Sequence, residues 1–123
     1  MEITTQEIKH VELITVRGRV DSVEAAGLAQ ALESALRRGK YKIVVDMSQV
    51  EYMSSAGFRA LGDAHRNSQR HHGGQVVLAQ VPPLIHEAFE LVGFTEFFHI
   101  EDSAAAAITF AENLPAGDSS GRS

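Results

Sequence analysis

The sequence contains no cysteine, which excludes a disulfide framework, a thiol nucleophile and a metal site built from cysteine. It has no uninterrupted apolar run of about 18 residues, the length that a membrane-spanning helix requires. Its N-terminus lacks the basic stretch and long apolar stretch of a signal peptide. A formal net charge of −5 over 123 residues disfavours sequence-independent binding to nucleic acid. We therefore expect a soluble, cytoplasmic protein with no membrane or nucleic-acid partner.

The motifs of common nucleotide-binding and hydrolytic enzymes are also missing. The sequence has neither the glycine-rich, lysine-bearing loop that cradles phosphates nor the glycine fingerprint of a dinucleotide-binding fold. A serine hydrolase needs a glycine two residues before its nucleophile, but Met53 stands two residues before Ser55. We therefore expect no catalytic residues, no bound metal and no cofactor, so that the protein is not an enzyme.

Three of the six histidines, His65, His71 and His72, cluster in the sequence. Two of them could hold zinc, but no third ligand is spaced to join them. We interpret the cluster as an exposed helix end followed by a polar turn.

The residues that are present alternate between the periodicities of strands and helices. Strands are predicted over 3–8, 11–16, 41–47 and 97–100, and 73–81 is predicted to be a turn followed by another buried strand. Helices are predicted over 21–39, 55–70, 82–91 and from 102 or 103 to 114. This order predicts an α/β fold, with one domain over 1–114 and a mixed, mostly parallel sheet of about four to five strands with about four helices. The β-branched runs at 43–45 and 76–78 are expected near the sheet centre, where both faces are covered. The small, polar segment 115–123 is predicted to be a disordered C-terminal tail.

The junction between the third strand and the second helix carries two adjacent hydroxyls, in the stretch "VVDMSQVEYMSSAGFRAL" at 44–61. On one interpretation Ser54 is only the helix N-cap and Ser55 only the first helical residue. On the other, Ser55 lies just past the carboxyl end of a strand, where functional sites of open α/β sheets occur. A phosphate on Ser55 would meet the free N–H groups at the helix N-terminus, and we expect Ala56 and Gly57 to leave room for it.

Charged residues near this junction allow two interpretations as well. Asp21 has the spacing of a capping box with Glu24, and Asp46 follows a strand-like run. Both aspartates are either local caps and turn-formers or residues that act beside Ser55. Arg59 and Asp63 share a helix face with two further arginines, which is either a solvated face or the near edge of a docking surface.

Three stretches resemble the STAS domain of the anti-sigma factor antagonist family: "GRVD" at 18–21, the junction at 44–61, and "GGQVVLAQVPPLIHEAFELVGFTEFFHI" at 73–100. The resemblance extends from about residue 3 to residue 114. It implies a small bacterial, cytoplasmic protein that binds an anti-sigma factor with a serine kinase domain and so frees a sigma factor for transcription. Partner switching follows from serine phosphorylation by the kinase, which abolishes binding, and a metal-dependent serine phosphatase reverses it.

Carried over by position, the resemblance implies that Ser55 is the phosphorylated residue. Ser54, the weaker candidate, stands where many members have Asp, and Ala56 stands where some have a second Ser. The implied partner-binding residues are Asp21, Asp46, Ser54, Ser55, Ala56, Gly57, Arg59 and Asp63.

Three alternatives remain open from the sequence. A STAS subunit of a larger sensory assembly, or a STAS domain serving a transporter, would bind its partner without phospho-switching. The third alternative, from a different class, is a small α/β enzyme.

Overall fold

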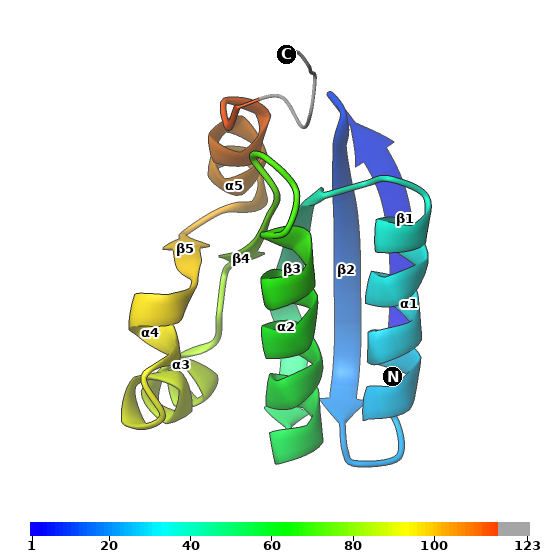
Figure 1. Ribbon diagram of the computed structural model, residues 1–123. Coiled ribbons are helices and arrows are strands. Elements are labelled where there is room, and N and C mark those ends of the chain that lie inside the picture. Colours follow the sequence, from blue (N-terminus) through cyan, green and yellow to red (C-terminus); the bar gives the residue numbers. More distant parts are fainter. Residues whose placement is uncertain (116–123) are drawn as a thin grey trace.

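The computed structural model describes residues 1–115, which form a mixed five-stranded sheet in the order β1-β2-β3-β4-β5 (Figure 1). The strands are β1 (Glu2–Ile8), β2 (Val11–Val20), β3 (Lys42–Met53), β4 (Gln75–Ala79) and β5 (His99–Glu101). Only β1 and β2 pair antiparallel, as a hairpin, and the other neighbours are parallel. The predicted α/β class, strand number and mixed sheet are therefore confirmed.

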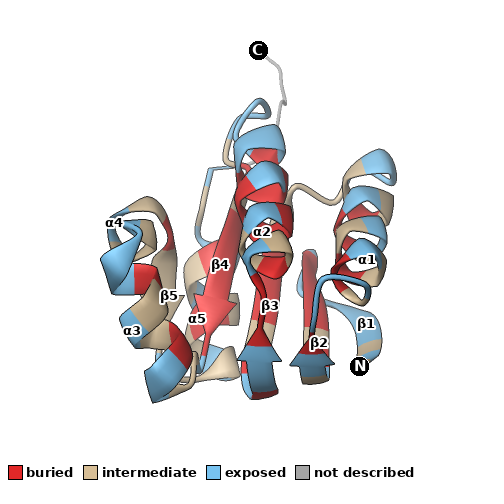
Figure 2. Cartoon of the chain, turned by 90° about the horizontal axis from the view of Figure 1, so that it is seen from below, coloured by how far each residue is buried: buried red, intermediate tan, exposed pale blue. Residues whose placement is uncertain are grey.

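The helices are α1 (Ala25–Arg37), α2 (Ser55–Ser68), α3 (Pro83–Leu91), α4 (Phe94–Phe97) and α5 (Ala104–Glu112). Figure 2 shows α1 and α2 on one face of the sheet and α5 on the other. Alternate residues of β3 serve the two layers, because Ile43 and Val45 belong to the large core cluster under α1 and α2 while Val44 packs with Ala107 and Ala111 of α5. β3 is the middle strand and β4 lies between β3 and β5, so both β-branched runs are internal, as predicted.

Three element boundaries lie four or more residues from their predicted positions, namely the start of the first helix, the end of β2, which is Val20 rather than 16, and the end of β3. The first helix begins at Ala25 rather than Asp21, because the Asp21 carboxylate accepts hydrogen bonds from the Val23 and Glu24 N–H groups and holds a turn ahead of the helix. β3 continues to Met53 rather than ending at 47, because β2 runs beside it as far as Val20 through two register irregularities.

The short helix α4 was not predicted. Gly93, with φ of 82°, ends α3 in the left-handed conformation, and one further helical turn follows before β5 begins at His99. The last helix is capped by Ser103, whose Oγ accepts a hydrogen bond from the Ala106 N–H at 3.0 Å. No helix within residues 1–115 is long and apolar enough to cross a membrane. Most of the predicted tail, 116–123, lies outside the described residues.

His65 is buried, so the interpretation of the histidine cluster as an exposed helix end is wrong for this residue. Its Nδ1 accepts a hydrogen bond from the Val76 N–H at 3.1 Å, and its ring lies 4.9 Å from Phe97 and 4.8 Å from Phe98. Burial is the main cause that lowers the pKa of His65 below 6.5. His71 is exposed in the following turn and stacks on Tyr41.

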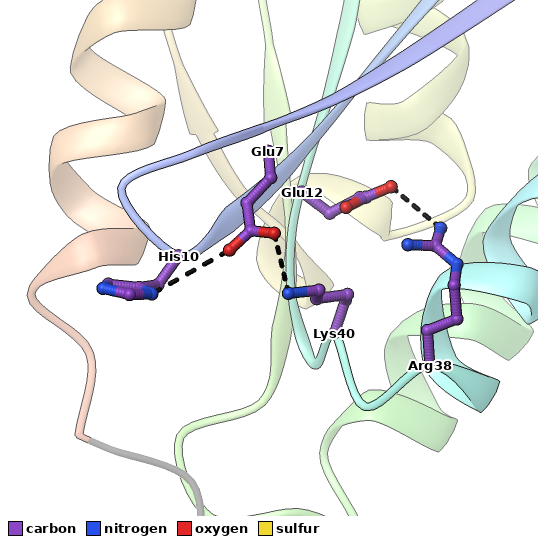
Figure 3. A network of polar contacts seen from close by, with 5 residues as sticks. All are labelled: Glu7, His10, Glu12, Arg38 and Lys40. Atoms are coloured by element: carbon purple, nitrogen blue, oxygen red, sulfur yellow. Dashed lines mark hydrogen bonds and ion pairs between the residues drawn. The ribbon is translucent and has the colours of Figure 1, made fainter.

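A polar network ties the β1–β2 hairpin to the segment that ends α1 (Figure 3). The Glu7 carboxylate lies 2.8 Å from Lys40 Nζ, and the Lys40 ammonium holds the pKa of Glu7 below its usual value. The buried Glu12 carboxylate accepts a hydrogen bond from Arg38 Nη2 at 2.9 Å. This network stabilises the end of the sheet at which β3 begins. The opposite end of the sheet is the one at which β3 finishes, at Met53.

Candidate functional site

The two serines at the start of α2 are in different environments. Ser54 is the N-cap and is only 9% exposed, and its Oγ accepts a hydrogen bond from the Gly57 N–H at 3.3 Å. Its backbone is also engaged, because its N–H donates to the Val20 carbonyl at 2.8 Å. Ser55 is the first helical residue and its side chain is exposed. The hydroxyl that a second protein can reach is therefore that of Ser55.

Gly57 faces the sheet and not the solvent around Ser55. A Cβ atom at this position would lie 2.7 Å from Met53 Cγ and 3.1 Å from Val20 Cγ1. Real Cβ atoms essentially never come within 3.0 Å of such an atom, so the contact with Met53 requires glycine in the first turn of α2 for the helix to sit directly on β2 and β3. The expectation that Gly57 leaves room around Ser55 was wrong in detail, since the residue brings the helix close to the strands.

Asp21 lies at the same edge of the sheet as Ser54 and Ser55. Val20 and Met53 are partners in the parallel ladder, so the residues that follow them, Asp21 and Ser54, leave the sheet side by side. Asp21 is exposed, and its Oδ1 lies 2.8 Å from the Glu24 N–H. Asp21 therefore has a local structural role, but it holds the turn before α1 and is not the N-cap, which is Glu24. Its carboxylate is also exposed beside the serine pair.

Asp46 lies away from this edge. Its ladder partner on β2 is Thr15, five residues before Val20, and five residues of strand span roughly 16 Å. Its Oδ1 accepts a hydrogen bond from the Ser48 N–H at 3.0 Å, within β3 at the first register irregularity. The hydrogen bond is local, but the turn that was predicted at Asp46 is not formed. The structure thus brings Asp21 but not Asp46 to the serines.

A shallow groove of about 280 Å³ runs between α1 and α2 next to the serines. Arg59 and Asp63 line it from α2, and Asp63 pairs with Arg66 on the same helix. Its remaining walls are small side chains, namely Ser22, Ala25, Ala26, Ala29, Ala56 and Ala60. The wall formed by α1 and the turn before it was not predicted from the sequence, although 22, 25, 26 and 29 follow the i, i+3, i+4, i+7 spacing of one helix face.

Two exposed apolar side chains complete this edge and were also missed. Val23 is 79% exposed in the turn before α1, and Tyr52 is 42% exposed near the end of β3. Arg19, the ladder partner of Tyr52, places its guanidinium 4.6 Å from the centre of the tyrosine ring. In the sequence, the only indication of this surface was Val23, a valine within an otherwise polar turn.

The geometry at Ser55 suits a phosphate. A helix N-terminus leaves its first N–H groups without intrahelical acceptors, and Ser54 Oγ occupies only that of Gly57. The helix dipole favours negative charge at this end, and the first turn of α2 contains no acidic residue. A phosphorylated Ser55 is therefore compatible with the fold, and its added charge would be exposed at the mouth of the α1–α2 groove.

Comparison with known proteins assigns the family, since the model of the STAS domain matches residues 2–107. The chain belongs to the STAS domain family. Over 116 residues this STAS domain is 31% identical to BtrV of Bordetella bronchiseptica, which is named as an anti-sigma factor antagonist, with 94% of this chain and 99% of BtrV covered. The sequence resemblance to the anti-sigma factor antagonist family is therefore confirmed.

Solved structures share the fold of this STAS domain. A Thermotoga maritima protein described as an anti-sigma factor antagonist has a TM-score of 0.83 at 15% identity, with 90% of this chain and 95% of that chain covered. SpoIIAA, a Bacillus cell fate determinant solved in its phosphorylated form, has a TM-score of 0.71 at 15% identity, with 89% and 98% covered.

Proposed function

We propose that this STAS domain is an anti-sigma factor antagonist controlled by phosphorylation of Ser55. Without phosphate it binds an anti-sigma factor that carries a serine kinase domain, and this binding frees a sigma factor for transcription. The observation that carries the proposal is the contrast between the two serines, because Ser55 is exposed at the start of α2 while Ser54 is buried as the N-cap. SpoIIAA, which has the same fold, is described in phosphorylated and unphosphorylated forms.

The partner contacts a surface that surrounds Ser55, which we call the switch surface. It comprises Asp21, Ser22, Val23, Tyr52, Ser55, Ala56, Arg59 and Asp63. Ser54 and Gly57 support this surface, because they hold the first turn of α2 in place. Asp46 has no contact role in this proposal, because it lies roughly 16 Å from the edge by strand geometry.

Phosphorylation acts on the interface and not on the fold. It adds about −1.5 to −2 charges to Ser55 at a helix N-terminus, where the dipole tolerates them. The same charge becomes costly when a partner covers the surface, because a desolvated anion without a cationic partner disfavours binding. The protein therefore works as a binding switch and not as an enzyme, and ATP with its magnesium ion belongs to the kinase.

Removal of the phosphate by a metal-dependent serine phosphatase would restore binding. The exposed position of Ser55 supports this step, because a second enzyme can reach the phosphoserine without unfolding α2.

A binding titration with the cognate anti-sigma factor kinase tests the proposal. Ser55→Ala should bind the kinase even with ATP present, and should cost the domain at most about 1 kcal/mol because Ser54 still caps the helix. Ser55→Asp should fold normally but bind at least tenfold more weakly than Ser55→Ala, since it places a charge at the contact. Equal affinities of Ser55→Asp and the unphosphorylated wild type would contradict the proposal.

A further inference from the structure

The outer face of α3 carries apolar side chains that no residue of the described chain covers. Leu84 is 79% exposed, Leu91 is 88% exposed, and Val92, which follows the helix, is 58% exposed. Leu84, Ala88 and Leu91 have i, i+4, i+7 spacing and therefore form one stripe. The inward face of the same helix is already packed against the protein, because Ile85 and Phe89 belong to the core.

This stripe is separate from the switch surface. Phe89 of α3 packs edge-on against Phe58 of α2, with ring centres 5.1 Å apart, so α3 lies directly beside α2. Figures 1 and 2 both place α3 on the side of α2 that is opposite to α1. The α1–α2 groove and the α3 stripe therefore lie on opposite sides of α2, and a partner on one leaves the other accessible.

Charge in this protein is segregated along the chain. Ten of the eleven lysines and arginines lie within residues 1–70, and residues 71–115 contain none. The same segment, 71–115, carries six acidic residues, namely Glu87, Glu90, Glu96, Glu101, Asp102 and Glu112. Glu87 and Glu90 are exposed along one side of the α3 stripe, and neither forms an ion pair with another residue of the described part of the chain.

We infer that the α3 stripe is a second docking surface, which binds a cationic amphipathic helix of a partner protein. Leucines at i and i+7 with alanine at i+4 suit the packing of another helix across them. The nine residues of α3 extend over about 14 Å, which corresponds to two to three turns of the bound helix. Lysine or arginine residues that flank the partner's apolar face would pair with Glu87 and Glu90.

The acidic edge also opposes two other occupants. A symmetric second copy of this chain would place Glu87 and Glu90 of the two protomers near one another, because a twofold interface uses the same patch twice. An anionic lipid surface would be repelled by the same carboxylates, and no lysine or arginine within 71–115 could offset this repulsion. This inference does not depend on phosphorylation of Ser55.

Fluorescence anisotropy with a defined probe tests the inference on the full-length protein. The probe is a labelled 18-residue synthetic helix with leucines on one face and lysines beside them, an arbitrary length chosen to exceed two to three turns. Saturable binding is expected, and Leu84→Gln together with Leu91→Gln should weaken it at least tenfold, since each leucine contributes apolar burial. Val23→Gln is the matched control, because Val23 has the same 79% exposure as Leu84 but lies on the switch surface, and it should leave the affinity unchanged.

Charge reversal supplies the second arm of the test. Glu87→Lys with Glu90→Lys should weaken the lysine probe at least tenfold and should favour a probe in which every lysine is replaced by glutamate. Ser55→Asp should leave probe binding unchanged, which separates this inference from the proposed switch. The inference is overturned if wild-type protein binds both probes equally or neither of them. It is also overturned if Leu84→Gln abolishes a dimer seen by sedimentation, or if the stripe binds vesicles of phosphatidylserine and phosphatidylcholine in place of the probe.

Discussion

Replacement of Gly57 by alanine should destabilise the domain, although alanine is the better helix former. The new Cβ would lie 2.7 Å from Met53 Cγ and 3.1 Å from Val20 Cγ1, and neither atom is the free end of a long side chain. Forcing a methyl group into such a site costs typically about 1–3 kcal/mol. The gain in helix propensity offsets at most about 1 kcal/mol of this. We therefore expect a net loss of up to about 2 kcal/mol in the free energy of unfolding.

Gly62, in the same helix, is the matched control. A Cβ there would meet only Phe94 Cζ at 3.7 Å and two atoms at 4.0 Å, which are ordinary contacts. Gly62→Ala should thus be neutral or stabilise by up to about 1 kcal/mol. Urea denaturation followed by circular dichroism measures both variants. If Gly57→Ala proves as stable as Gly62→Ala, the close seating of α2 on the strands is refuted.

A double-mutant cycle identifies the side chain that causes the clash. Met53→Ala removes the atoms nearest to the new Cβ at position 57, so the double variant should lose less stability than the sum of the two single losses. If the new Cβ in Gly57→Ala pushes the first turn of α2 away from the strands, phosphorylation of Ser55 by the kinase should also become slower. Simple additivity of the two losses would place the strain elsewhere.

Three further predictions follow from buried or exposed groups. Burial lowers the pKa of His65, so the unfolded state binds a proton at this residue before the folded state does. The free energy of unfolding should therefore fall as the pH drops below about 6.5, and His65→Gln should flatten this slope in denaturation curves at several pH values. Arg38→Ala leaves the Glu12 carboxylate buried without its ion partner and should cost about 1–3 kcal/mol by urea denaturation, a loss that Glu12→Gln in the same chain should reduce. Tyr52→Ser should leave the melting temperature unchanged but weaken binding of the anti-sigma factor kinase several-fold in calorimetric titrations, since this side chain is 42% exposed on the switch surface.

The parts of the fold that depend on local patterns could be predicted from the sequence. The β-branched runs at 43–45 and 76–78 need cover on both faces, and this alone identified two internal strands of the sheet. Ser54 was correctly identified as a cap, because serine is one of the residues preferred at the N-cap position. Gly93 was correctly identified as the end of α3, because glycine readily adopts the left-handed conformation that ends a helix.

The remaining features depend on contacts between distant segments. Histidine is a polar residue, so its place in the sequence did not indicate burial. His65 is buried because β4 and the segment around Phe97 pack against it. Asp21 and Asp46 looked equivalent in the sequence, but the ladder register places only Asp21 beside the serines. The inward direction of Gly57 could not be read from its spacing to Ser55, because it depends on Met53 and Val20 lying beneath the helix.

Site-resolved mass spectrometry after incubation with the cognate kinase and ATP tests the central claim most directly. The wild type and Ser54→Ala should each gain one phosphate, located on Ser55, with Ser54→Ala modified more slowly because its helix lacks the cap. Ser55→Ala should remain unmodified over the same time. Phosphate on Ser54 of the wild type, with normal modification of Ser55→Ala, would contradict the account.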